Sequence, residues 1–213
     1  MNIRPNSILV VNSAFPALNY LAACLAQEGL LEKYIRPYAN LNRWWEKLLP
    51  YVPGLKSAYM RTFGRRTLPP GLNSSNLKEI GVIDDFALAL CRYLPANSRR
   101  RMGNYFIDRL EAEIRKASSA LLVNPDIVIG AYHVSYDVFT HAKGIKILDY
   151  PIAHHRYMYK LLTEDRQLEP SFASMFNQGD FSRPENDDLL DAEIEIADKI
   201  LVPSSFVKQS FQF

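Results

Sequence analysis

The sequence predicts an α/β fold built on a doubly wound, mainly parallel sheet with helices on both faces. Short apolar runs of the kind that form buried parallel strands recur through the chain, and helical patterns separate them. This alternation is typical of parallel sheets, whose crossover connections are helical. The 213 residues contain no internal repeat and no low-complexity linker, so we expect one Rossmann-like domain over 1–213.

The first elements are expected to be strand, helix and strand. The apolar run over 8–11 predicts a buried strand, and residues 34–36 predict a second, short one. Between them, 19–28 predicts a helix with Asn19 as its N-cap and Gly29 directly after its end. Four residues are expected on one stripe of this helix: Tyr20, Leu21, Cys24 and Leu25.

The middle of the chain, at about 37–103, predicts a helical insertion without a clean strand. Prolines divide it into short pieces, at positions 37, 50, 53, 69, 70 and 95. A longer helix is expected over about 104–118, with a stripe formed by Phe106, Leu110 and Ile114. The alternation then resumes, with strands expected at 126–130, 145–148 and 199–203, and helices at 136–142, 154–164 and 187–197. Ser204 is the expected N-cap of a last helix.

Composition restricts the class of protein. Hydrophobic residues make up 48% of the chain and charged residues 23%, which is typical of a globular protein and excludes a disordered one. No apolar run is long enough to cross a bilayer, and residues 1–7 do not resemble a secretory signal. The two cysteines are too few for a disulfide scaffold. We therefore expect a cytoplasmic protein, either free or at the cytoplasmic face of the membrane.

Charge is distributed unevenly along the chain. Residues 1–116 hold 17 Lys and Arg against 9 Asp and Glu, whereas 117–213 hold 8 against 14. Within the basic half, 41–72 interleaves aromatic and basic residues, which suits an anionic membrane surface or a lipid phosphate. A packed core with solvated basic side chains fits the pattern equally well. No nucleic-acid recognition motif is present. The expected membrane or phosphate contacts are Arg61, Arg65 and Arg66.

Side chains that can do chemistry gather in loops after predicted strands, where open parallel sheets bind ligands. The first loop, 12–17, has no glycine, so it does not predict a dinucleotide site. The loop at 149–156 combines an aspartate, two histidines and an arginine, a group that can bond sugar hydroxyls or balance a phosphate. An exposed helix N-terminus would give the same pattern. On a helix, His154 and His155 would point about 100° apart, so a shared ligand is not expected.

Other patterns favour structure over chemistry. The acidic residues of 187–198 have the spacing of a solvated helix face, rather than of paired catalytic carboxylates or a cation site. The inner stripe of that helix is expected to be Leu189, Leu190, Ile194 and Ala197. The four histidines have no HExxH or CxxC spacing, so no metal site is expected. A nucleophile elbow of the Gly-x-Ser-x-Gly type is absent.

Three segments in the second half share a pattern with one enzyme family. One is Asp149-x4-His154-x-Arg156, which continues through a Leu pair to a Glu. Another, 193–207, has Glu-x3-Ala-Asp, an apolar strand and Ser-x-Phe-Val. The third is a Pro-Asp, strand, His segment at 125–133. In their order and spacing these segments resemble the N-terminal half of family-4 (group 1) glycosyltransferases, retaining enzymes whose B-type fold has two facing Rossmann-like domains.

The resemblance implies that this chain is the acceptor-side half of such an enzyme. The nucleotide-sugar donor would be a co-substrate bound mainly by a C-terminal half that the chain lacks, so catalysis by the 213 residues alone is not expected. The whole enzyme would need no cofactor or metal, and would transfer a sugar with retention to a glycan or lipid-linked acceptor, in polysaccharide biosynthesis. His154 is the implied catalytic residue. Acceptor binding is assigned to Asn12, Phe15, His133, Asp149, Arg156 and Ser204.

The alternative is a non-enzymatic module, a Rossmann-like domain that binds the membrane peripherally through 41–72. A free-standing binder of another metabolite has only the fold class in its favour. Salt-sensitive binding to anionic vesicles distinguishes the membrane module from a protein without a membrane surface.

Overall fold

A computed structural model describes the chain except for residues 1–6, 14, 52–55, 122–123, 170–185 and 213. Within the described part, six strands form one sheet in the order β3-β2-β1-β4-β5-β6, and every neighbouring pair is parallel. This is the strand order of a Rossmann fold, in which the order reverses between the first and the fourth strand. The predicted α/β class with a parallel, helix-covered sheet is confirmed.

All the strands except β3 coincide with apolar runs of the sequence. Their bounds are β1 (Ile8–Val11), β2 (Leu31–Arg36), β3 (Leu77–Glu79), β4 (Ile127–Ala131), β5 (Ile145–Asp149) and β6 (Lys199–Leu201). β1 is buried along its whole length, because β2 and β4 flank it in the sheet. The expectation of no strand in 37–103 is wrong, since β3 pairs with β2 there. β3 is a three-residue edge strand with polar Lys78 and Glu79, so no apolar run marks it.

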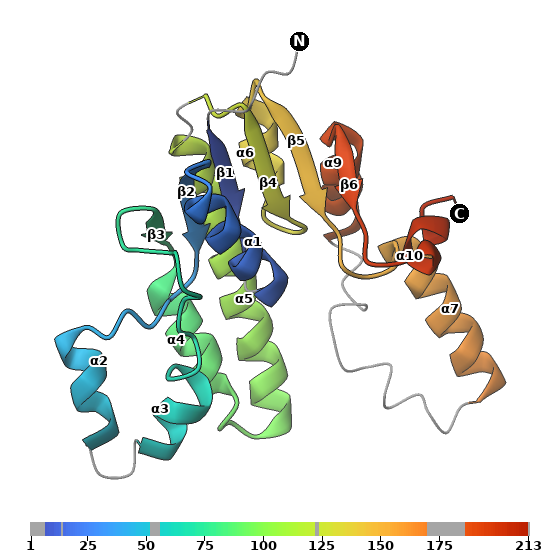
Figure 1. Ribbon diagram of the computed structural model, residues 1–213. Helices are drawn as coiled ribbons and strands as arrows, with labels where there is room; N and C mark the ends of the chain where they lie inside the picture. The colour runs from blue at the N-terminus through green and yellow to red at the C-terminus, as the bar shows by residue number, and fades with distance from the viewer. Residues whose placement is uncertain (1–6, 14, 52–55, 122–123, 170–185, 213) are drawn as a thin grey trace.

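Helices connect the strands and extend past their ends. Their bounds are α1 (Pro16–Gln27), α2 (Trp44–Leu48), the 3₁₀ helix η1 (Leu49–Tyr51), α3 (Lys56–Thr62), α4 (Val82–Cys91), α5 (Ala96–Ala120), α6 (Tyr136–His141), α7 (His155–Leu168), α9 (Asp187–Ile196) and α10 (Ser205–Ser210). In Figure 1, α1 lies in front of the sheet, and α5, α6 and α9 lie behind it. No helix in the described ranges is long and apolar enough to cross a membrane.

α1 begins three residues earlier than expected. Pro16 occupies its first turn, where the fixed φ of proline suits a helix and its missing N–H costs nothing. Asn19 therefore lies inside the helix instead of capping it. The buried face is Leu18, Ala22 and Ala23, whereas Tyr20 and Cys24 of the expected stripe are exposed. The predicted end is confirmed, because Gly29 has a φ of +68° directly after the helix.

The insertion between β2 and α5 has an apolar cluster of its own. Tyr38, Tyr59, Phe63 and Ala89 are buried in it, and Trp45 and Phe86 pack against it. The aromatic residues of 41–72 are thus divided. Tyr59 and Phe63 form core, whereas Trp44 and Tyr51 are 75% and 83% exposed. The following helix, α5, starts at residue 96 and is longer than the sequence pattern indicated.

Candidate functional site

The carboxyl ends of β4, β5 and β6 lie in line at one edge of the sheet. Tyr132 N donates to Asp149 O over 3.2 Å, and Tyr150 N donates to Leu201 O over 2.9 Å, so the three strands leave the sheet together. Figure 1 shows α7 and α10 beyond these ends, and α2 and α3 beyond the carboxyl end of β2, farther along the same edge. The edge is where open parallel sheets bind ligands.

Five side chains form a connected group at this edge, which we call the histidine cluster: Tyr150, His154, His155, Arg156 and Asp191. Four of them belong to the loop after β5 and the start of α7, and Asp191 belongs to α9. α7 begins there because Tyr150-Pro151 ends the extended chain and His154 caps the next helix. The four loop residues are close together because they are neighbours in the sequence, whereas Asp191 is brought to them by the packing of α9.

His155 is held from both sides of its ring. The Tyr150 hydroxyl lies 3.1 Å from Nδ1, and Nε2 lies 3.0 Å from the Asp191 Oδ1. Its side chain is 9% exposed, and this burial lowers its pKa below the usual range, against the opposing effect of Asp191. The contact of Nε2 with the Asp191 carboxylate lacks hydrogen-bond geometry, so the Tyr150 hydroxyl is the described hydrogen-bond partner of the ring. The His155 ring is therefore occupied by contacts with Tyr150 and Asp191 and has little surface left for a ligand.

His154 caps α7 with its imidazole. Nδ1 accepts from the Arg156 backbone N–H over 3.3 Å, and the His154 N–H donates to Ser210 Oγ over 2.8 Å. The ring stacks on His155, with centroids 4.4 Å apart, and meets the edge of Phe211. The two histidines do not diverge by the angle expected on a helix, because His154 precedes the first helical residue. The expectation that they point apart is wrong.

The contacts of His154 determine which hydrogen bond it offers to a ligand. Burial and the neighbouring His155 lower its pKa, so the neutral ring is favoured near pH 7. Since Nδ1 accepts from the backbone, the proton of the neutral ring is on Nε2. Among the described residues, Nε2 has no hydrogen-bond partner, so His154 can donate to a ligand hydroxyl.

Asp149 is the last residue of β5 and is half-buried. Burial raises its pKa, and its carboxyl group makes no hydrogen bond or ion pair with any residue the structure describes. A carboxylate in this position is free to accept a hydrogen bond or a proton from a bound hydroxyl. Asp149 and His154 together give one acceptor and one donor at the carboxyl end of one strand.

Glu193 contradicts the expectation of a solvated acidic face on α9. Its side chain is fully buried and accepts from three backbone N–H groups, those of His133 and Ser135 at 2.7 Å and of Tyr136 at 3.0 Å. His133 has a φ of +73°, and Arg115 donates to its carbonyl oxygen over 2.8 Å. Glu193 thus fixes the loop after β4. The sequence pattern did not indicate this structural role, because Glu193 lies among other acidic residues.

The residues predicted after β1 form a network inside the fold. Asn12 is fully buried, and its side chain bonds the backbone of Phe15 and the Tyr34 hydroxyl. The Phe15 ring lies 5.1 Å from that of Tyr132, across the point where the strand order reverses. Asn12 therefore shapes the loop and is not placed to contact an acceptor directly.

Arg156 and Ser204 are also engaged. Arg156 donates to Asp191 Oδ2 from Nε at 2.9 Å and Nη2 at 2.5 Å, so its charge is already balanced. Ser204 Oγ accepts from Val207 N over 3.3 Å, which confirms it as the N-cap of α10. α10 then places Ser210 and Phe211 against His154.

The three arginines predicted to contact membrane or phosphate do not act as one group. Arg61 lies exposed on α3, whereas Arg65 and Arg66 line a pocket near the carboxyl end of β2. Arg66 forms an ion pair with Asp85. This pocket lies on the β2 side of the sheet, whereas the histidine cluster follows β5.

One group of side chains could hold a metal ion. The ligand atoms of His154, His155 and Asp191 all lie within 4.8 Å of one another, which is compatible with imidazole and carboxylate coordination. In the present geometry, Arg156 already neutralises the carboxylate, and Tyr150 engages His155. We therefore interpret the group as a hydrogen-bonded support for His154.

Comparisons with protein-family models, with curated proteins and with solved structures find no match for this chain. The fold and the site are thus the observations that bear on function.

Several residues of the site were not among those predicted from the sequence: Tyr150, His155, Asp191, Glu193, Ser210 and Phe211. Tyr150 and His155 had a signal, because they lie in the loop at 149–156. Asp191 and Glu193 had a weaker one, since both are acids near the inner stripe of α9. Ser210 and Phe211 had none, because only the return of α10 places them beside His154.

Proposed function

We propose that this chain is the acceptor-binding half of a retaining glycosyltransferase. Such an enzyme transfers a sugar from a nucleotide-sugar to a glycan or lipid-linked acceptor, in polysaccharide biosynthesis. One observation carries the proposal. The segments with the family-like spacing, 125–133, 149–156 and 193–207, meet at the carboxyl ends of β4, β5 and β6.

The chemistry of the site supports a saccharide ligand. Sugar hydroxyls both donate and accept hydrogen bonds, and the site offers an acceptor on Asp149 and a donor at Nε2 of His154. Stacked and edge-on rings from His155 and Phe211 fix the orientation of His154. In the proposed reaction, Asp149 and His154 orient the acceptor hydroxyl, and the donor sugar is held by a second domain.

Saccharide binding by the purified chain tests the proposal. We expect saturation-transfer NMR with a panel of oligosaccharides to detect binding, and His154→Ala or Asp149→Asn to weaken it about 5-fold, since one hydrogen bond is worth about 1 kcal/mol. His141→Ala and Asp165→Asn are matched controls, because His141 bonds the Asp137 carbonyl at the far end of α6 and Asp165 is exposed on α7. Binding that is absent from the whole panel, or that survives both site variants, contradicts the proposal.

A second candidate function is peripheral membrane binding by the insertion. Trp44, Leu48, Tyr51 and Met60 are all exposed on α2, η1 and α3, beside exposed basic residues of the same helices. Aromatic and aliphatic side chains next to basic ones suit an anionic bilayer surface.

Vesicle co-sedimentation tests this second candidate. We expect binding to anionic vesicles that decreases at high salt and falls several-fold in Trp44→Ala/Leu48→Ala, because the interaction combines apolar insertion with charge attraction. Tyr105→Ala is the control, since Tyr105 is an exposed aromatic residue on α5, outside the insertion helices α2, η1 and α3. Equal binding by the wild type and both variants argues against this surface.

A further inference from the structure

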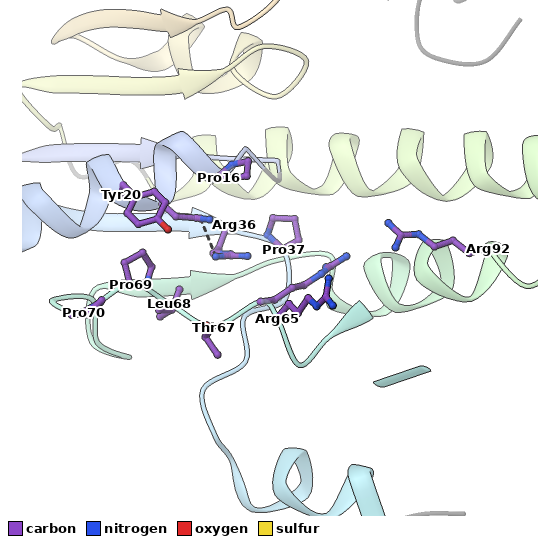
Figure 2. A pocket seen from close by; sticks show the side chains of 12 residues that line it. Pro16, Tyr20, Arg36, Pro37, Arg65, Thr67, Leu68, Pro69, Pro70 and Arg92 are labelled. Carbon is purple, nitrogen blue, oxygen red and sulfur yellow. Dashed lines mark hydrogen bonds between the residues drawn. The ribbon is translucent and has the colours of Figure 1, made fainter. Parts of the chain in front are cut away.

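A strongly basic pocket lies at the carboxyl end of β2, apart from the histidine cluster. It has a volume of about 620 Å³ and is enclosed by the first turn of α1, the end of β2, the 65–70 segment and the end of α4. Of the residues that the structure describes, four arginines line it and no acidic residue does. We call it the arginine pocket, after Arg36, Arg65, Arg66 and Arg92. Figure 2 shows Arg36, Arg65 and Arg92 around the pocket, with Tyr20, Pro69 and Pro70 at one end of it.

Arg36 is built into the wall of this pocket. It is only 6% exposed, and its Nη1 donates to Asn19 Oδ1 over 3.0 Å, a bond drawn in Figure 2. Nη2 donates to the Tyr38 carbonyl over 3.3 Å. Its buried Nε has no hydrogen-bond partner in the described structure, which is costly for so polar a group. A neutral amide and a carbonyl hold this guanidinium in place without balancing its charge.

The other charges of the pocket are also largely unbalanced. Arg66 is paired with Asp85. Arg65 and Arg92 make no hydrogen bond or ion pair with the residues that the structure describes, and Arg36 makes no ion pair with them. Burial and the charge of Arg66 lower the pKa of Arg36, although an arginine keeps its proton at neutral pH. Three positive charges therefore face one cavity without a carboxylate partner.

The first turn of α1 adds to the positive potential. Pro16, Asn19 and Tyr20 line the pocket, and the 12-residue helix has no side-chain cap at its N-terminus. Free backbone N–H groups and the helix dipole both favour an anion at this end. The helix end thus adds to the positive potential of the pocket. Most of that potential comes from Arg36, Arg65 and Arg92, whose charges do not depend on the helix.

We propose that the arginine pocket binds the diphosphate group of a phosphorylated ligand. A guanidinium group forms bidentate hydrogen bonds with phosphate oxygens, and three such groups can balance the negative charge of two linked phosphates. The volume leaves room for the group attached to the diphosphate, with Tyr20 and the prolines at 16, 37, 69 and 70 as its less polar wall. The ligand is either a soluble diphosphate ester or a lipid with a diphosphate headgroup. The proposal does not depend on the glycosyltransferase assignment.

Calorimetric titration of the full chain with inorganic pyrophosphate and with orthophosphate tests the pocket. We expect pyrophosphate to bind at least about 10-fold more tightly than orthophosphate, because it reaches more guanidinium groups. Arg65→Ala/Arg92→Ala is expected to weaken pyrophosphate binding at least about 10-fold. Both residues are exposed, so this variant keeps the fold. Arg36→Lys keeps the charge but loses the planar fork, and is expected to weaken binding as well.

The matched control removes the same charge elsewhere. Arg100→Ala/Arg101→Ala neutralises two exposed arginines of α5 that do not line the pocket, and is expected to bind as the wild type does. Co-sedimentation with phosphatidylcholine vesicles that carry a polyprenyl diphosphate identifies the source of the ligand. Pocket-dependent binding to pyrophosphate without binding to the vesicles indicates a soluble ester, and pocket-dependent binding to the vesicles indicates a lipid. Binding to neither, or an equal loss in the pocket and control variants, overturns the proposal.

Discussion

Glu193→Ala is expected to lower the free energy of unfolding by about 4 kcal/mol, because each of three buried N–H groups left without an acceptor costs roughly 1–3 kcal/mol. Those groups belong to His133, Ser135 and Tyr136, and the carboxylate that accepts from them is fully buried. Urea unfolding followed by circular dichroism measures the loss.

Glu195→Ala is the control for this substitution. Glu195 lies two residues farther along α9 and is exposed, so its removal is expected to change the stability by less than about 0.5 kcal/mol. Equal stability of the wild type and Glu193→Ala would mean that the three N–H groups find water or another partner.

The same residue is expected to make stability depend on pH. Burial raises the pKa of Glu193 from 4.5 to about 7, although the three backbone N–H groups and Arg115 oppose the shift. The raised pKa means that the folded protein binds a proton more tightly than the unfolded chain. Its contribution is therefore complete below pH 4.5 and is lost as the pH rises through 7. The stability difference between wild type and Glu193→Gln should fall over that window, by up to about 1.4 kcal/mol per pH unit.

Gly130→Ala is the second substitution with a large expected effect. A Cβ at Gly130 in β4 would overlap the Ser135 hydroxyl and lie 2.9 Å from the Ser135 Cβ. Ser135 is fully buried and donates to the Ala131 carbonyl over 2.6 Å, so it cannot move aside. We expect a loss of about 1–3 kcal/mol, the usual cost of overpacking a core. Thermal unfolding measures it.

Gly103→Ala provides a control of opposite sign. Gly103 lies inside α5, and an added Cβ would meet only Leu88 Cδ1, at 4.0 Å. Because alanine favours the helix over glycine, we expect a gain of about 0.5–1 kcal/mol. A stabilised Gly130→Ala would show that the close approach of Ser135 is not required.

Local patterns account for most of the fold. β1 and β4 appear where short apolar runs predict them, because a strand buried on both faces is apolar throughout. β5 also appears at its predicted run, although only its Leu148 is buried. Gly29 ends α1, and Ser204 starts α10, through interactions within a few residues. β3 was missed for the opposite reason, since a short edge strand needs no apolar run. The start of α1 was missed because a proline at the first turn substitutes for a capping side chain.

The sequence by itself determined the order of the strands and helices along the chain, apart from β3, and the cluster of polar residues at 149–156, because both depend on neighbours along the chain. Only the tertiary structure decided that Glu193 is buried under a loop about 60 residues away, that Asp191 holds His155, and that Arg36 and Arg92 share a pocket. These pairings depend on which strand lies beside which, and on how far each helix extends past the sheet. Side-chain periodicity tells which face of an element is apolar, but it carries no information about which distant polar group that face will meet.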